Sequence, residues 1–173
     1  MSGAFLFGKL PAHGDFVARG LSHDRRDALD GWLAAAMERG RERHGAAFDD
    51  RYDAAPPWRF VTASREAGAL VPSVDRVGRR FPLLLGVAGS GEAASSACEE
   101  LIYRAFTEGW DADRLIAAVE QAPLDEDNTP KRDGPTASRW WTLGSDAFDP
   151  AELDGAWPEA LVAVMLAPAG ERR

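Results

Sequence analysis

Residues 58–88, WRFVTASREAGALVPSVDRVGRRFPLLLGVA, indicate the fold class of this chain. The segment contains three apolar runs of strand length, at residues 58–63, 69–73 and 81–88. The links between these runs are too short for a parallel crossover, which takes about a dozen residues, so neighbouring runs should pair antiparallel. We therefore predict a β-sheet that is at least partly antiparallel.

Helices are predicted on both sides of this segment. Residues 24–44 repeat their apolar side chains at helical spacing and follow Ser22, a residue type that caps helices. Residues 95–108 show a second amphipathic pattern, and Asp111 is placed to cap a third helix that runs through Val119. We also expect a strand at residues 4–9, a loop at 10–20 and a further strand at 138–143.

The C-terminal part of the chain has weaker patterns. Residues 123–137 are polar and rich in proline, which predicts a long exposed loop. Asp149 and Pro150 favour a short helical turn, whereas the apolar run at 161–166 fits a helix or a strand equally well. Because the chain has no internal repeat and no compositional break, we predict one domain over residues 1–173, with helices packed on a mixed sheet.

Composition restricts the class of function. Apolar residues make up 45% of the chain and charged residues 28%, as in an ordinary globular protein with a packed core. The formal net charge of −8 disfavours nucleic acid as a partner. One cysteine, Cys98, and the absence of a signal-peptide pattern or a membrane-length apolar run predict a cytoplasmic protein that does not insert into membranes.

The first candidate motif is GAFLFGK at residues 3–9, which has most of the spacing of a phosphate-binding P-loop. Leu10 stands where that motif needs a hydroxyl for magnesium, so we expect neither a nucleotide nor any other cofactor. His13 and Asp15 follow closely, but the spacing of the histidines does not fit zinc, and an aspartate beside a glycine usually bonds its own backbone. We predict no metal site and no catalytic residues.

A second motif is the arginine-rich turn PSVDRVGRRFP at residues 72–82. Arg76, Arg79 and Arg80 suit recognition of a carboxylate or a phosphate, and the alternative is that Asp75 and other acidic residues pair with them internally. Adjacent side chains on a strand point to opposite faces, so Arg79 and Arg80 should diverge. We expect at least one of these arginines to tie the turn to the Asp15 loop, and at least one to stay exposed for an acidic group of a partner.

Trp140 and Trp141 are adjacent on a predicted strand, so their side chains should also point to opposite faces. Both rings are buried only if both faces of the sheet are covered, and otherwise one of them marks an interface. We expect the covered sheet.

The motifs FGKLPAHGDFV at 7–17, APPWRF at 55–60, PSVDRVGRRFP at 72–82 and SRWW at 138–141 together resemble the TagF family, also called ImpM, which is associated with bacterial type VI secretion. The resemblance implies a three-layer α/β/α sandwich. It also implies a cytoplasmic repressor that acts post-translationally on type VI assembly through the forkhead-associated scaffold protein. It does not imply an enzyme.

Two other functions remain as alternatives: a small phosphate-handling enzyme built on the Lys9–Asp15 loop and the Arg76–Arg80 turn, and a structural subunit associated with the secretion baseplate. The oligomeric state stays open. Our candidates for binding a protein partner are Lys9, His13, Asp15, Asp75, Arg76, Arg79, Arg80, Trp140 and Trp141.

Overall fold

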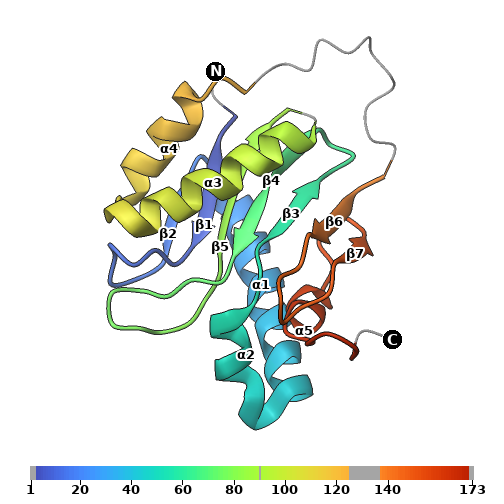
Figure 1. The fold of residues 1–173 in the computed structure, drawn as a ribbon. Coiled ribbons are helices and arrows are strands. Elements are labelled where there is room, and N and C mark those ends of the chain that lie inside the picture. The colour runs from blue at the N-terminus through green and yellow to red at the C-terminus, as the bar shows by residue number, and fades with distance from the viewer. Residues whose placement is uncertain (1–2, 90, 125–136, 172–173) are drawn as a thin grey trace.

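A computed structural model describes residues 3–89, 91–124 and 137–171. Within these residues the chain forms one seven-stranded sheet in the order β2-β1-β5-β4-β3-β6-β7 (Figure 1). The strands are β1 Phe5–Gly8, β2 Val17–Arg19, β3 Trp58–Val61, β4 Glu66–Val71, β5 Leu83–Ala88, β6 Arg139–Thr142 and β7 Ala151–Asp154. The helices are α1 His23–His44, α2 Phe48–Ala54, α3 Glu92–Glu108, α4 Ala112–Gln121 and α5 Leu161–Met165, with a 3-10 turn at Gly45–Ala47.

Every pairing between neighbouring strands of the described sheet is antiparallel. The antiparallel pairing of the short-linked strands β3, β4 and β5 is confirmed, but the mixed sheet that we expected is wrong. The reason lies in the two helical connections. One joins β2 to β3 and the other joins β5 to β6, and neither pair of strands lies side by side in the sheet. No parallel neighbours result among the described strands, and the chain has an antiparallel α/β fold.

Helices cover both faces of the sheet (Figure 1). On one face α1, α2 and α5 pack against alternate strand residues such as Phe5, Phe60 and Leu84. On the other face α3 and α4 pack against the residues between them, including Leu83 and Leu85. This alternation follows from the pleat of a strand, in which successive side chains point to opposite faces.

A row of residues crosses the centre of the sheet and is built around two glycines. Gly86 in β5 lies beside Gly68 in β4, Phe5 pairs with Gly86, and Phe60 pairs with Gly68. A methyl group added to Gly86 would lie 2.4 Å from the Phe5 ring, and one added to Gly68 would lie 2.1 Å from the carbonyl oxygen of Leu85. The two glycines therefore make room for aromatic rings over the middle of the sheet.

Most predicted elements are confirmed, with some displaced ends. Ser22 accepts a hydrogen bond from the Arg25 N–H at the start of α1, and Asp111 accepts one from the Arg114 N–H at the start of α4. The open assignment at 161–166 is settled as the short helix α5. None of the helices in the described ranges is both long and apolar enough to cross a bilayer.

Two predictions of local structure were wrong, and one helix was missed. The segment after Asp149 forms the strand β7, because it pairs with β6, instead of a helical turn. The predicted loop at 10–20 includes the strand β2, which pairs with β1. The helix α2 was not predicted at all. Of the predicted exposed loop at 123–137, residues 125–136 lie outside the described residues.

Candidate functional site

The candidate site forms where the chain leaves β1 and where the turn between β4 and β5 meets it. Gly8 ends β1 with a φ of +134°, and a side chain there would lie 2.0 Å from the carbonyl oxygen of Pro82. The next residue, Lys9, is buried, and its ammonium group lies 3.1 Å from the Asp75 carboxylate. The lysine of the P-loop-like motif is thus one half of an internal ion pair.

The buried carboxylate of Asp75 holds the conformation of the turn between β4 and β5. One carboxylate oxygen accepts hydrogen bonds from the backbone N–H groups of Val77, at 3.1 Å, and Arg79, at 2.9 Å. The other lies 2.6 Å from Nε of Arg79 and also contacts Lys9. Burial opposes the charged form of Asp75, but the hydrogen bonds from Arg79 and Lys9 outweigh it and hold the pKa of the carboxyl well below its ordinary value of 3.8.

The turn is joined to the 10–16 loop by several hydrogen bonds. The Arg76 N–H donates to the carbonyl of His13 at 2.8 Å, and the Arg76 guanidinium donates to the carbonyl of Ala12. The Arg79 guanidinium donates to the carbonyl of Gly14 at 2.7 Å. The expectation that at least one arginine ties the turn to this loop is therefore confirmed, and two arginines do so.

His13 and Asp15 have local roles in the loop. His13 Nε2 accepts a hydrogen bond from the Ala112 N–H at the start of α4, at 3.0 Å, which fixes the loop against that helix. The Asp15 carboxylate accepts from the N–H of Phe16 at 2.8 Å, so the prediction that it bonds its own backbone is confirmed. Among the residues that the structure describes, no cluster of three His, Cys, Asp or Glu side chains is placed to hold a metal ion.

Arg80 diverges from Arg79, as the sequence predicted. Its guanidinium forms a two-pronged contact with Asp53 of α2, at 2.8 and 2.7 Å, and lies 3.2 Å from Asp49. The hydrogen bond from Arg80 lowers the pKa of the Asp53 carboxyl below its ordinary value. Internal pairing, one of the two readings of the arginine turn, therefore holds for Arg79 and Arg80.

The same two loops expose apolar side chains that sequence reasoning missed. Phe16 is 46% exposed, although its ring packs edge-on against Phe81 and lies 5.0 Å from the Lys9 ammonium group. Val77, at the tip of the turn, is 72% exposed. We call Phe16, Arg76, Val77 and Arg79 the two-loop surface. Nothing in the pattern D-F-V or R-V-G distinguishes these side chains from buried ones, so no sequence signal was available.

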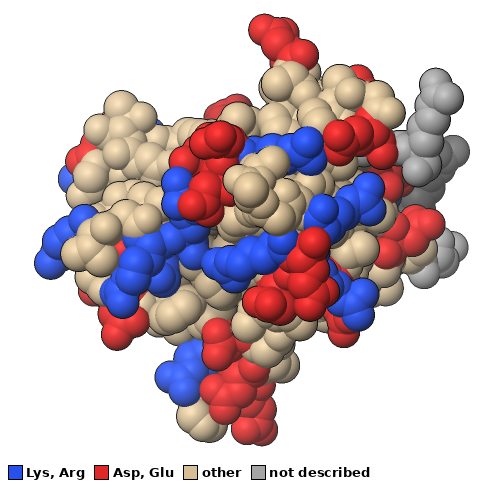
Figure 2. Space-filling model, turned by 90° about the horizontal axis from the view of Figure 1, so that it is seen from below, with Lys and Arg blue, Asp and Glu red and all other residues tan. Residues whose placement is uncertain are grey.

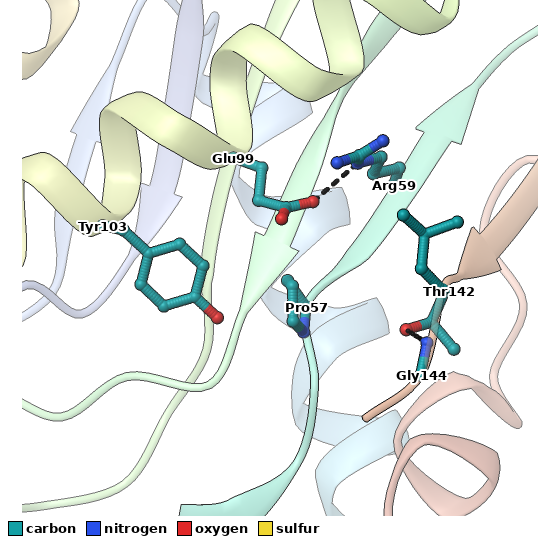
Figure 3. Close-up of a pocket in the computed structure, with 7 residues that line it drawn as sticks. Pro57, Arg59, Glu99, Tyr103, Thr142 and Gly144 are labelled. Atoms are coloured by element: carbon teal, nitrogen blue, oxygen red, sulfur yellow. Dashed lines mark hydrogen bonds and ion pairs between the residues drawn. The ribbon is translucent and has the colours of Figure 1, made fainter. Parts of the chain in front are cut away.

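A second exposed apolar feature is a recess of about 260 Å³ between α3 and the end of β6 (Figure 3). Its lining includes an ion pair between Arg59 Nε and Glu99 at 2.6 Å, and the Tyr103 ring points into it from α3 (Figure 3). Leu143, at its rim, is 69% exposed. Burial and the nearby Glu99 raise the pKa of Tyr103, so its hydroxyl stays protonated. The recess can accept an apolar side chain.

Residues 5–125 match the family model described as the TagF N-terminal domain, type VI secretion system-associated. The chain belongs to the TagF family. The resemblance seen in the motifs is confirmed, and both loops of the candidate site lie within the matched residues. A solved structure of PA0076 from Pseudomonas aeruginosa PAO1 has the same fold, with a TM-score of 0.74 and 24% sequence identity over 94% of this chain and 93% of that one. No curated protein matches the sequence.

The adjacent tryptophans of the TagF chain, Trp140 and Trp141, lie beyond the family match and are both buried. Trp140 stacks on Phe60 with ring centroids 4.6 Å apart and belongs to the core under α1. Trp141 lies on the opposite face beside Val61 and Ala67. The covered sheet is confirmed, and neither ring presents much surface to a partner.

Proposed function

We propose that this TagF chain is a cytoplasmic accessory protein of the type VI secretion system that represses its assembly post-translationally, by binding the forkhead-associated scaffold protein. The observation that carries the proposal is the family match over residues 5–125, which includes two hydrogen-bonded loops with exposed apolar and basic side chains. The net charge of −8 disfavours a nucleic-acid partner.

The phosphate-handling alternative loses much of its support from the positions of its cations. Lys9 is buried against Asp75, and Arg80 is paired with Asp53, so a phosphate would have to displace a carboxylate to reach either cation. Arg79 also pairs with Asp75 but stays 60% exposed, so Arg79 and Arg76 are the accessible cations of the turn. The arrangement favours binding of a protein over catalysis.

The test of the proposed function is secretion of the type VI tube protein by the native bacterium. We expect overproduction of this chain to suppress export and its deletion to raise export, with the level of the scaffold protein unchanged. Unaltered export in both strains, with the system active, would contradict repression. If the chain instead co-purifies with the assembled machine in a fixed ratio and deletion abolishes export, it is a structural subunit of the baseplate.

A further inference from the structure

The two-loop surface combines exposed apolar area with a rigid backbone. Val77 has 72% of its surface exposed at the tip of a turn whose conformation is held by the buried Asp75. Phe16 is half exposed and is fixed from beneath by Phe81 and Lys9. An apolar patch that is already ordered loses little conformational entropy when a partner covers it, which favours tight binding.

The net charge of the two loops is positive, whereas that of the whole chain is negative. The two loops, residues 9–16 and 72–82, contain four Lys and Arg side chains and two carboxylates, while the whole chain has a net charge of −8. Asp75 is paired with Lys9 and Arg79, whereas Asp15 is exposed, accepts a hydrogen bond from the N–H of Phe16 and keeps its negative charge. Seen from below, Lys and Arg side chains form a band across the molecule, flanked by acidic groups (Figure 2).

Arg76 is the cation of this surface that is most available to a partner. Within the residues that the structure describes, Arg76 donates hydrogen bonds only to carbonyl groups of the 10–16 loop, and it has no ion pair there. Arg79 pairs with Asp75, yet 60% of its side chain is exposed. A guanidinium held by a neutral carbonyl keeps its full charge and presents its remaining N–H groups in a fixed direction.

The recess beside Tyr103 has no comparable charge to offer. Its arginine, Arg59, is already paired with Glu99, and only 19% of either side chain is exposed. Leu143 is nevertheless as exposed as Val77, at 69% against 72%, so the two positions form a matched pair for an experiment.

We propose that the two-loop surface is the docking site for the partner, and that it takes an acidic segment of the forkhead-associated scaffold protein in which an apolar side chain lies beside carboxylates. The apolar side chain covers Val77 and Phe16, and the carboxylates pair with Arg76 and the exposed part of Arg79. The inference rests on the proposed function, because the scaffold protein is the partner that it names.

The test measures binding of the full chain to the purified scaffold protein by biolayer interferometry. Val77→Asp and Arg76→Glu should each weaken binding by about tenfold or more, because both place negative charge against an acidic segment. Leu143→Asp, the matched control, should stay within about twofold of the wild type. Binding by the wild type should weaken as salt rises, and less so for Arg76→Glu.

The outcomes separate the inference from the proposed function. Wild-type affinity in both variants, or a loss confined to Leu143→Asp, would overturn the docking site while leaving the scaffold as the partner. No binding by the wild type would overturn the scaffold proposal and the inference with it. Melting temperatures of all variants are measured first, and Val77→Ser replaces Val77→Asp if the aspartate lowers the melting temperature.

Discussion

Asp75 shows how a single buried carboxylate can set the shape of a surface that it does not itself reach. It accepts hydrogen bonds from two backbone N–H groups of its own turn and contacts two cations, Lys9 of the first loop and Arg79 of its own turn. Arg79 then extends to Gly14. The carboxylate therefore places Val77 and Phe16 indirectly, through the backbone and the cations around it.

At this scale we predict a specific pH dependence of stability. The folded-state pKa of Asp75 lies below its ordinary value of 3.8, so its ionised form stabilises the fold above about pH 4, and this stabilisation is lost as the pH falls further. Asp75→Asn should lower the melting temperature at pH 7 by at least about 5 °C. Between pH 4 and pH 2 the difference between variant and wild type should shrink.

Asp15→Asn is the control, because the Asp15 carboxylate is exposed and, among the described residues, accepts only its neighbour's N–H. It should change the melting temperature little at either pH. Thermal unfolding followed by circular dichroism measures both variants. A gap between Asp75→Asn and wild type that stays constant down to pH 2 would show that the charge of Asp75 contributes nothing to folding.

At the scale of elements, the centre of the sheet depends on the absence of two side chains. Gly68 and Gly86 lie side by side on β4 and β5, and Phe5 and Phe60 flank them on β1 and β3. Glycine inside a strand normally weakens it, because it has no side chain to pack and loses more entropy on folding. Here the neighbouring aromatic rings fill the vacant space, so the strand continues through the glycine.

We predict that Gly68→Ala and Gly86→Ala each destabilise the protein by roughly 1–3 kcal/mol, because the added methyl group overlaps Leu85 and the Phe5 ring respectively. Gly31→Ala provides the control. It lies in α1, where an added methyl group meets nothing within 4 Å, and should stabilise the protein by about 0.5–1 kcal/mol. Urea denaturation measures all three variants. Equal stability of Gly68→Ala and wild type would mean that the sheet relaxes freely around this position.

At the scale of the whole molecule, the sheet separates two apolar cores. One lies under α1, α2 and α5, and the other lies under α3 and α4. Cys98 sits in the second core with no exposed surface, and burial raises the pKa of its thiol to about 12. The chain therefore carries one natural reporter for the opening of that core.

We predict that iodoacetamide at pH 8 modifies Cys98 at least about 1,000-fold more slowly in the native protein than in urea. The reason is that the reaction requires an exposed sulfur in the thiolate form, whereas in the folded core Cys98 is buried and its thiol stays protonated. Mass spectrometry of the modified chain over time provides the rates. Similar rates in the two conditions would show that α3 opens readily from the sheet.

Local patterns in the sequence were enough for several parts of this architecture. The apolar spacing and the cap at Ser22 placed α1, and the short links at 58–88 implied antiparallel pairing. The motifs in both loops pointed to the TagF family, which the family match confirms. These predictions were correct because helix periodicity, capping and link length depend on residues that are close along the chain.

The rest depended on residues that are distant along the chain. β4 begins at Glu66, three residues before the predicted start of the strand at residue 69, and so includes Gly68. The strand can continue through this glycine because Phe60 of β3 lies opposite it and covers it. β2 and β7 exist because β1 and β6 pair with them. Arg79 donates to the carbonyl of Gly14, 65 positions away, a contact that only the folded chain brings about. Exposure of Val77 and Phe16 likewise follows from what the remaining chain leaves uncovered, since burial is a property of three-dimensional packing and not of residue type.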